Sequence, residues 1–150
     1  MTIQPIIFAT SLLFAIAANG AHAAEPQYIR SPATTKNNLP FSDAVRVGDL
    51  VFLSGQIGNI PGSLKLADGG IDGETRQAMK NIGSALELAG TSWNHVVKCT
   101  VFLSDIKDWP AFNVVYKEFF TSNLPARSAL AASGLALGAK VEVECIAAVK

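Results

Sequence analysis

Residues 74–103, ETRQAMKNIGSALELAGTSWNHVVKCTVFL, decide the fold, because a helix signal, a stop and a strand signal follow one another there. Apolar side chains recur at helical spacing over residues 74–89, which predicts a helix with one buried face. These side chains are Ala78, Met79, Ile82, Ala85, Leu86 and Ala89. Gly90 supplies the stop, and residues 96–103 form a β-branched and aromatic run of strand length. The stretch therefore predicts a helix that leads directly into a sheet.

Further strand signals lie upstream of this stretch. Residues 45–47 and 50–54 are rich in apolar side chains and flank the turn pair Gly48-Asp49, a pattern typical of a β-hairpin. Asp72 is predicted to cap the helix that follows. Residues 24–38 are polar and contain proline, so they are predicted as an extended arm or as a first strand.

A second helix and two more strands are predicted downstream. Asp108 and Pro110 are expected to open the helix. Its buried stripe is predicted to consist of Phe112, Val115, Tyr116 and Phe119. Residues 127–133 and 141–149 are predicted as strands joined by a turn over residues 134–138. The predicted order is β-β-α-β-α-β-β, preceded by one more strand if the N-terminal arm pairs.

The sheet is predicted to carry helices on one face only, since two helices cannot cover both faces of a sheet of five or six strands. The strands are nevertheless apolar at both alternations, as in Val51, Phe52 and Leu53. We therefore expect the bare face to meet another subunit. In the last strand, the alternation predicts one side facing the core and the other bearing Glu142 and Glu144.

Cys99 and Cys145 are both predicted to face the helix-covered core, Cys99 together with Val97, Val101 and Leu103. As buried small side chains they are expected to be inert rather than nucleophilic. An oxidising compartment would also allow a disulfide if their strands are adjacent, and the spacing alone leaves both alternatives open.

The composition excludes several classes of protein. The 150 residues are 49% hydrophobic and 16% charged, with 12 Lys and Arg against 12 Asp and Glu. These values are typical of one compact domain and of neither a disordered nor a fibrous chain. Without a basic excess to neutralise phosphates, nucleic acid is not the expected partner.

Residues 1–23 are predicted to be a secretory signal peptide. Residues 1–24 contain no charged side chain, and residues 6–18 form an apolar run too short to span a bilayer comfortably. Ala21-His22-Ala23 supplies the small residues that signal peptidase accepts, so cleavage is expected after Ala23 and the protein is expected to be periplasmic or secreted. An uncleaved anchor and an ordinary amphipathic helix are the alternatives.

The sequence predicts a metal-free mechanism. After cleavage, His95 would be the single histidine, and Cys99 and Cys145 are too far apart for a CxxC zinc or redox motif. His95 lies between a helix-ending glycine and a strand, where we expect a structural role.

Arg127 and Glu142 are the two residues that suggest chemistry. Arg127 follows Pro125-Ala126 at the start of a strand, where its planar guanidinium can present two N–H groups to a carboxylate. Glu142 lies opposite the core in a strand otherwise rich in Val, Ile and Ala, and can hold a water or a proton. The alternative interpretation is a structural Arg–Glu ion pair at a subunit interface.

Several motifs together resemble the reactive intermediate deaminase A (RidA, or YjgF) family over residues 39–149, so residues 39–150 are predicted as one RidA-like domain. The motifs lie at residues 54–58, 74–78, 96–103, 112–116, 125–128 and 141–144. The resemblance implies a chorismate-mutase-like α+β fold, with a mixed sheet and two helices on one face. It also implies a homotrimer with sites between subunits.

By this resemblance, the site would hydrolyse a 2-imino or 2-enamino acid, such as 2-iminopropanoate or 2-iminobutanoate, to a 2-oxo acid and ammonia without a cofactor. Arg127 would bind the carboxylate of the substrate, and Glu142 would orient or activate the hydrolytic water. Ser54 and Gly55 would line the site, and Asn113 would support it. Backbone groups near Ala129 would meet the substrate or its water.

Two positions depart from the family pattern. Phe41 stands where the best-known members have a tyrosine, and Ala129 stands where they often have a cysteine. Neither side chain can supply the missing hydroxyl or thiol, so the substrate range is expected to differ. The alternative function is a noncatalytic periplasmic module that binds small carboxylates. A chaperone-like protein or a ribonuclease of the same fold fits the neutral charge and the export signal less well.

Overall fold

A computed structural model describes residues 23–149. The predicted signal peptide therefore lies outside the described residues, apart from its last one. One seven-stranded sheet runs through the molecule, in the order β1-β2-β3-β7-β5-β6, with β4 paired to β7. The strands are β1 (Gln27–Ile29), β2 (Ala44–Val47), β3 (Leu50–Leu53), β4 (Gln56–Ile57), β5 (Val96–Leu103), β6 (Ala126–Ala131) and β7 (Val141–Ala148).

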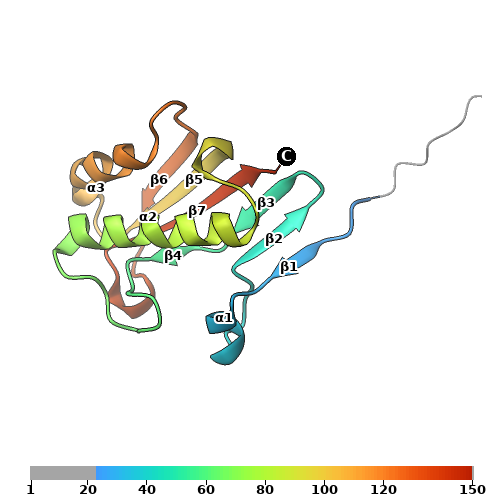
Figure 1. Cartoon of the computed structure of the whole chain (residues 1–150). Helices are drawn as coiled ribbons and strands as arrows, with labels where there is room; N and C mark the ends of the chain where they lie inside the picture. Colours follow the sequence, from blue (N-terminus) through green and yellow to red (C-terminus); the bar gives the residue numbers. More distant parts are fainter. Residues whose placement is uncertain (1–22, 150) are drawn as a thin grey trace, which may run out of the picture.

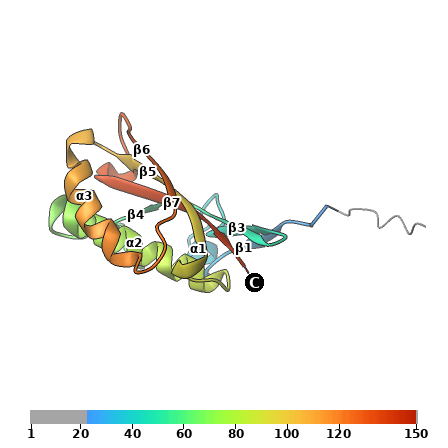
Figure 2. The same ribbon diagram turned by 90° about the horizontal axis from the view of Figure 1, so that it is seen from above.

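The sheet is mixed, because β6 pairs in parallel with β5 while the other strand pairs are antiparallel. The longer helices α2 (Gly70–Leu88) and α3 (Trp109–Tyr116) lie side by side against one face of this sheet (Figures 1 and 2). This arrangement confirms the predicted α+β class and its one-sided helix layer. The remaining helices are the short α1 (Pro32–Lys36) and 3-10 turns at Trp93–His95, Ile106–Asp108, Lys117–Phe119 and Ala136–Gly138.

The core lies between the helices and the sheet. The expected side of α2 is buried, including Ala78, Met79, Ile82 and Leu86. In β7, Val141, Val143, Cys145 and Ala147 are buried, while Glu142, Glu144, Ile146 and Ala148 are not. The alternation predicted for the last strand is confirmed. No helix in the described part of the chain is both long enough and apolar enough to cross a membrane.

Two local predictions were wrong. Helix α2 begins at Gly70, because Gly69 adopts a left-handed conformation (φ 104°) and forms its N-cap. Asp72 therefore lies in the first turn of the helix, where its charge favours the positive end of the dipole. Val97 does not face the core. A register irregularity between Val96 and Lys98 buries Val96 and leaves Val97 47% exposed.

Cys99 and Cys145 form a disulfide that links β5 to β7. The two residues are direct register partners in the antiparallel pair, and both are buried. The sequence left open whether the two cysteines are buried free thiols or a disulfide, and the structure shows the disulfide.

The face of the sheet opposite the helices is rich in apolar side chains. Register places Val45, Phe52 and Ile146 in one row across β2, β3 and β7, and Phe102 beside Leu130 in the next strands. Phe52 is 43% exposed and Leu130 is 44% exposed. Figure 2 shows no helix over this side of the central strands. Residues 23–149 of a single copy therefore leave an apolar sheet surface open.

Candidate functional site

Arg127 lies in β6 and points to the helix-covered side of the sheet. Its register partner in β5 is Cys99, and side chains at paired positions share a face. The guanidinium carbon lies 4.8 Å from the ring centroid of Tyr116 and 5.7 Å from that of Phe112. Both rings come from α3. The parallel pairing of an edge strand thus places a half-buried cation against an aromatic helix face.

A pocket of about 260 Å³ opens beside this guanidinium. It is lined by Asn113, Tyr116, Lys117, Leu124, Pro125 and Arg127. Among the described side chains, none forms an ion pair or hydrogen bond with the Arg127 guanidinium. Oδ1 of Asn113 is also buried without a partner in this part of the chain. The unneutralised cation in this pocket suits a small carboxylate ligand, and the Asn113 oxygen can accept a hydrogen bond from an N–H or O–H group of the same ligand.

Glu142 lies on the other side of the sheet. Its register partners are Phe102 in β5 and Ile57 in β4, and its side chain is half-buried. Burial raises the pKa of the Glu142 carboxyl above its ordinary value of 4.5, and the negative charge of Glu144 adds to this shift. The raised pKa makes the carboxylate a stronger base, which suits a group that accepts and returns a proton.

Gly55 gives the Glu142 carboxylate its space. A Cβ atom at Gly55 would overlap Oε1 of Glu142, so only glycine fits there without moving the carboxylate. The hydroxyl of Ser54 donates a 2.6 Å hydrogen bond to the carbonyl of Ser42, which ties this loop to the residue after Phe41. Phe41 itself is 46% exposed. Ser54, Gly55 and Glu142 thus belong to one loop-and-strand cluster, which we call the Glu142 cluster, and Phe41 adjoins it through the backbone of Ser42.

The predicted site residues therefore fall into two groups on opposite faces of the sheet. Ala129 shares a side with Arg127 and packs against the core, and Asn113 lies on the adjacent helix. We call these three residues the Arg127 cluster. The structure does not bring Arg127 and Glu142 together within one chain, and no ion pair joins them there. Each chain holds two separate halves of the predicted site.

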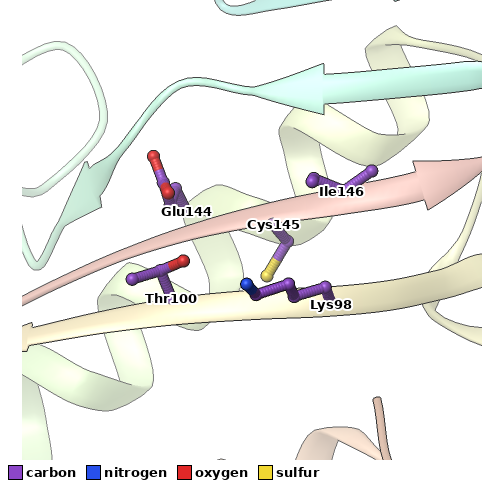
Figure 3. A pocket seen from close by; sticks show the side chains of 5 residues that line it. All are labelled: Lys98, Thr100, Glu144, Cys145 and Ile146. Atoms are coloured by element: carbon purple, nitrogen blue, oxygen red, sulfur yellow. The ribbon is translucent and has the colours of Figure 1, made fainter. Parts of the chain in front are cut away.

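A smaller pocket of about 110 Å³ lies on the bare face, between β5 and β7 (Figure 3). It contains none of the predicted site residues. Lys98 and Thr100 line it from β5, and Glu144 and Ile146 line it from β7. Glu144 is thus placed near enough to raise the pKa of Glu142 without belonging to the Glu142 cluster. Among residues 23–149, no three His, Cys, Asp or Glu side chains gather as metal ligands would.

Sequence reasoning placed Tyr116 and Phe112 in the core and missed their contact with Arg127. Both side chains are indeed buried, so that prediction is confirmed. The missed signal is the helical spacing, since Tyr116 lies three residues after Asn113 and four after Phe112. This spacing puts a site residue and two aromatic rings on neighbouring parts of one helix surface.

We expect Gly55→Ala to lower any turnover that depends on Glu142 about a hundredfold, because the added methyl group displaces the Glu142 carboxylate by roughly an ångström. Steady-state kinetics on the folded variant would measure the loss. Gly134→Ala is the matched control, because a Cβ there meets nothing within 4 Å. Equal activity of both variants would show that the position of Glu142 is unimportant.

Comparisons with known proteins identify the family of this chain. The family described as Endoribonuclease L-PSP matches residues 31–149. Human 2-iminobutanoate/2-iminopropanoate deaminase is 44% identical over 108 residues, covering 72% of this chain and 79% of the human protein. RidA from an Antarctic Psychrobacter species is 36% identical, with a TM-score of 0.70 and coverage of 73% and 89% of the two chains.

A further solved relative is Escherichia coli TdcF with bound serine. It is 31% identical, with a TM-score of 0.70, and the match covers 74% of this chain and 89% of TdcF. The family match spans most of the chain, and the human deaminase and TdcF are each more than 30% identical and covered over more than two thirds of their length. On this evidence the chain belongs to the RidA (YjgF, Endoribonuclease L-PSP) family of reactive intermediate deaminases.

Proposed function

We propose that the protein hydrolyses 2-imino and 2-enamino acids, such as 2-iminopropanoate and 2-iminobutanoate, to 2-oxo acids and ammonia. The observation that carries this proposal is the Arg127 guanidinium, which lies in a pocket with no carboxylate partner from the described chain. A planar guanidinium binds a carboxylate through two parallel N–H groups. The names of relatives such as the human deaminase support this substrate class.

In this mechanism Glu142 accepts a proton from a water molecule while the water oxygen attacks the imine carbon. The C=N electron pair moves to nitrogen, which takes up a proton from solvent, and a carbinolamine forms. Glu142 then returns its proton to the amino nitrogen and the C–N bond breaks. Ammonia leaves while the carbinolamine hydroxyl gives its proton to solvent, so that the 2-oxo acid remains. The raised pKa of Glu142 suits both transfers. The imine carbon is already electrophilic, so the protein's main task is to orient substrate and water.

The complete site would form between copies of the chain, in a homotrimer. The Arg127 cluster and the Glu142 cluster lie on opposite faces of one sheet, so a second copy is needed to place them around one substrate. The apolar surface around Phe52 and Leu130 supports association through the bare face. Serine bound to E. coli TdcF supports a ligand that carries a carboxylate and is as small as the proposed substrates.

We also propose that the protein is exported and that its substrates are met outside the cytoplasm, in the periplasm or beyond. The apolar run and the Ala21-His22-Ala23 ending favour cleavage after Ala23. The buried Cys99–Cys145 disulfide supports folding in an oxidising compartment. Mass measurement on protein from its native host should give a chain starting at Ala24. An intact Met1 terminus on cytoplasmic protein would refute export.

The direct test is an assay with freshly generated 2-iminopropanoate, in which release of pyruvate and ammonia is followed against buffer alone. Turnover identifies the hydrolase. Saturable binding of 2-oxobutanoate without turnover would instead identify the noncatalytic carboxylate-binding module. Absence of both would refute the proposed function and leave the chaperone-like alternative.

A further inference from the structure

The Arg127 guanidinium is held by aromatic rings rather than by acidic groups. It lies over Tyr116 at 4.8 Å and over Phe112 at 5.7 Å, and among the described residues it has no ion-pair partner. We propose that Tyr116 is a positioning residue, whose ring, with that of Phe112, forms an aromatic seat that orients Arg127 toward the carboxylate of the substrate. This inference rests on the proposed function and names a residue that it does not include.

An aromatic seat suits a guanidinium that must bind a carboxylate. The negative face of a ring attracts the cation without neutralising it, whereas an acidic partner would occupy the N–H groups that the substrate needs. A free arginine side chain also loses considerable rotamer freedom when a ligand immobilises it. Rings that restrict the guanidinium beforehand reduce this loss. The seat therefore increases the affinity for the carboxylate rather than the rate of the chemical step.

The Tyr116 ring is itself held firmly in place. It packs on Phe112 with ring centroids 5.3 Å apart and on Phe120 with centroids 4.8 Å apart. Phe120 in turn makes an edge contact with Trp93 at 5.3 Å. Phe112, Tyr116 and Phe120 are buried in the core of the domain, and the partly buried Trp93 packs against it. A fixed ring gives the flexible Arg127 side chain a defined position.

The ring of Tyr116, and not its hydroxyl, performs this role. Tyr116 is 3% exposed, and its hydroxyl oxygen is buried without a hydrogen-bond partner in the described part of the chain. Burial raises the pKa of Tyr116 to about 12, while the nearby Arg127 charge lowers it in part, so the hydroxyl stays neutral at working pH. The pocket beside Arg127 is lined by Tyr116 as well as by the guanidinium, so both lie next to a ligand bound there.

The test compares Tyr116→Phe with Tyr116→Leu, by calorimetric binding of 2-oxobutanoate and by imine kinetics. Tyr116→Phe keeps the ring, so its Kd for 2-oxobutanoate and its KM for the imine should stay within about twofold of wild type. Tyr116→Leu should raise Kd and KM about tenfold and change kcat much less, because a desolvated cation–π contact is lost. Unchanged affinity in Tyr116→Leu, or an equal loss in Tyr116→Phe, would overturn the aromatic seat.

Two controls separate positioning from general destabilisation. Phe119→Leu removes a neighbouring ring that stacks on Trp93 instead, and it should leave Kd unchanged. If Tyr116→Leu does not fold, pentafluorophenylalanine at position 116 keeps the ring shape and reverses its electrostatic face. It should weaken 2-oxobutanoate binding relative to phenylalanine, and equal binding by the two would reject the seat.

The binding readout distinguishes this inference from the proposed function. A wild-type protein that binds 2-oxobutanoate but does not hydrolyse the imine would refute the hydrolase, and a loss of binding in Tyr116→Leu would still support the seat. A wild-type protein that hydrolyses the imine, with full 2-oxobutanoate affinity in a folded Tyr116→Leu variant, would refute the seat alone.

Discussion

Glu142→Gln should lower kcat for imine hydrolysis about a thousandfold, because the amide keeps the shape of the carboxylate but cannot accept the proton of the attacking water. The affinity for 2-oxobutanoate should stay within a few-fold of wild type, since Arg127 still binds the carboxylate. Stopped-flow kinetics and calorimetry on the same preparation would measure both quantities. Undiminished hydrolysis would show that Glu142 has no part in the proton transfers.

The pH profile gives this prediction a second readout. Burial and the charge of Glu144 raise the pKa of Glu142, so its carboxyl ionises at a higher pH than that of an ordinary glutamate. Activity that needs the ionised form should therefore rise with pH along an acid limb that lies above 4.5. Glu144→Gln removes the like charge and should move this limb to lower pH without abolishing turnover. If the acid limb did not move in Glu144→Gln, the ionisation of a group other than Glu142 would be responsible for it.

Mixed assemblies of Arg127→Ala and Glu142→Gln chains should recover activity that neither variant has alone. Arg127 and Glu142 lie on opposite faces of one sheet, so a site between copies takes its guanidinium from one chain and its carboxylate from another. A trimer that contains both kinds of chain then has one site with both groups intact. Such trimers should show about one third of the wild-type activity.

Co-expression with two different affinity tags, followed by purification on both, would isolate the mixed assemblies. The two single-variant proteins, purified and simply combined without exchange of subunits, are the control and should remain inactive. A doubly tagged assembly with no recovered activity would place both groups in one chain. Light scattering on the same sample would report whether the assembly has three chains.

Much of the fold could be predicted from local patterns. The helical recurrence from Ala78 to Ala89 and the alternation around Glu142 were both confirmed. The reason is that the side on which each side chain lies follows a period set by the geometry of the backbone. The errors arose where that period breaks. The irregularity between Val96 and Lys98 turned Val97 outward, and the left-handed Gly69 moved the start of α2 ahead of Asp72.

The sequence by itself determined the family, the order of the longer elements and the residue types that the proposed chemistry needs, since these depend on motifs and local periods. The short α1 and β4 were not predicted. Only the tertiary structure decided that Arg127 meets Tyr116, that Cys99 meets Cys145 and that Glu142 lies on the other face. Alternation tells which residues of one strand share a side, but pairing with a distant strand decides which side that is. For Arg127, the parallel pairing of β6 with β5 made that decision.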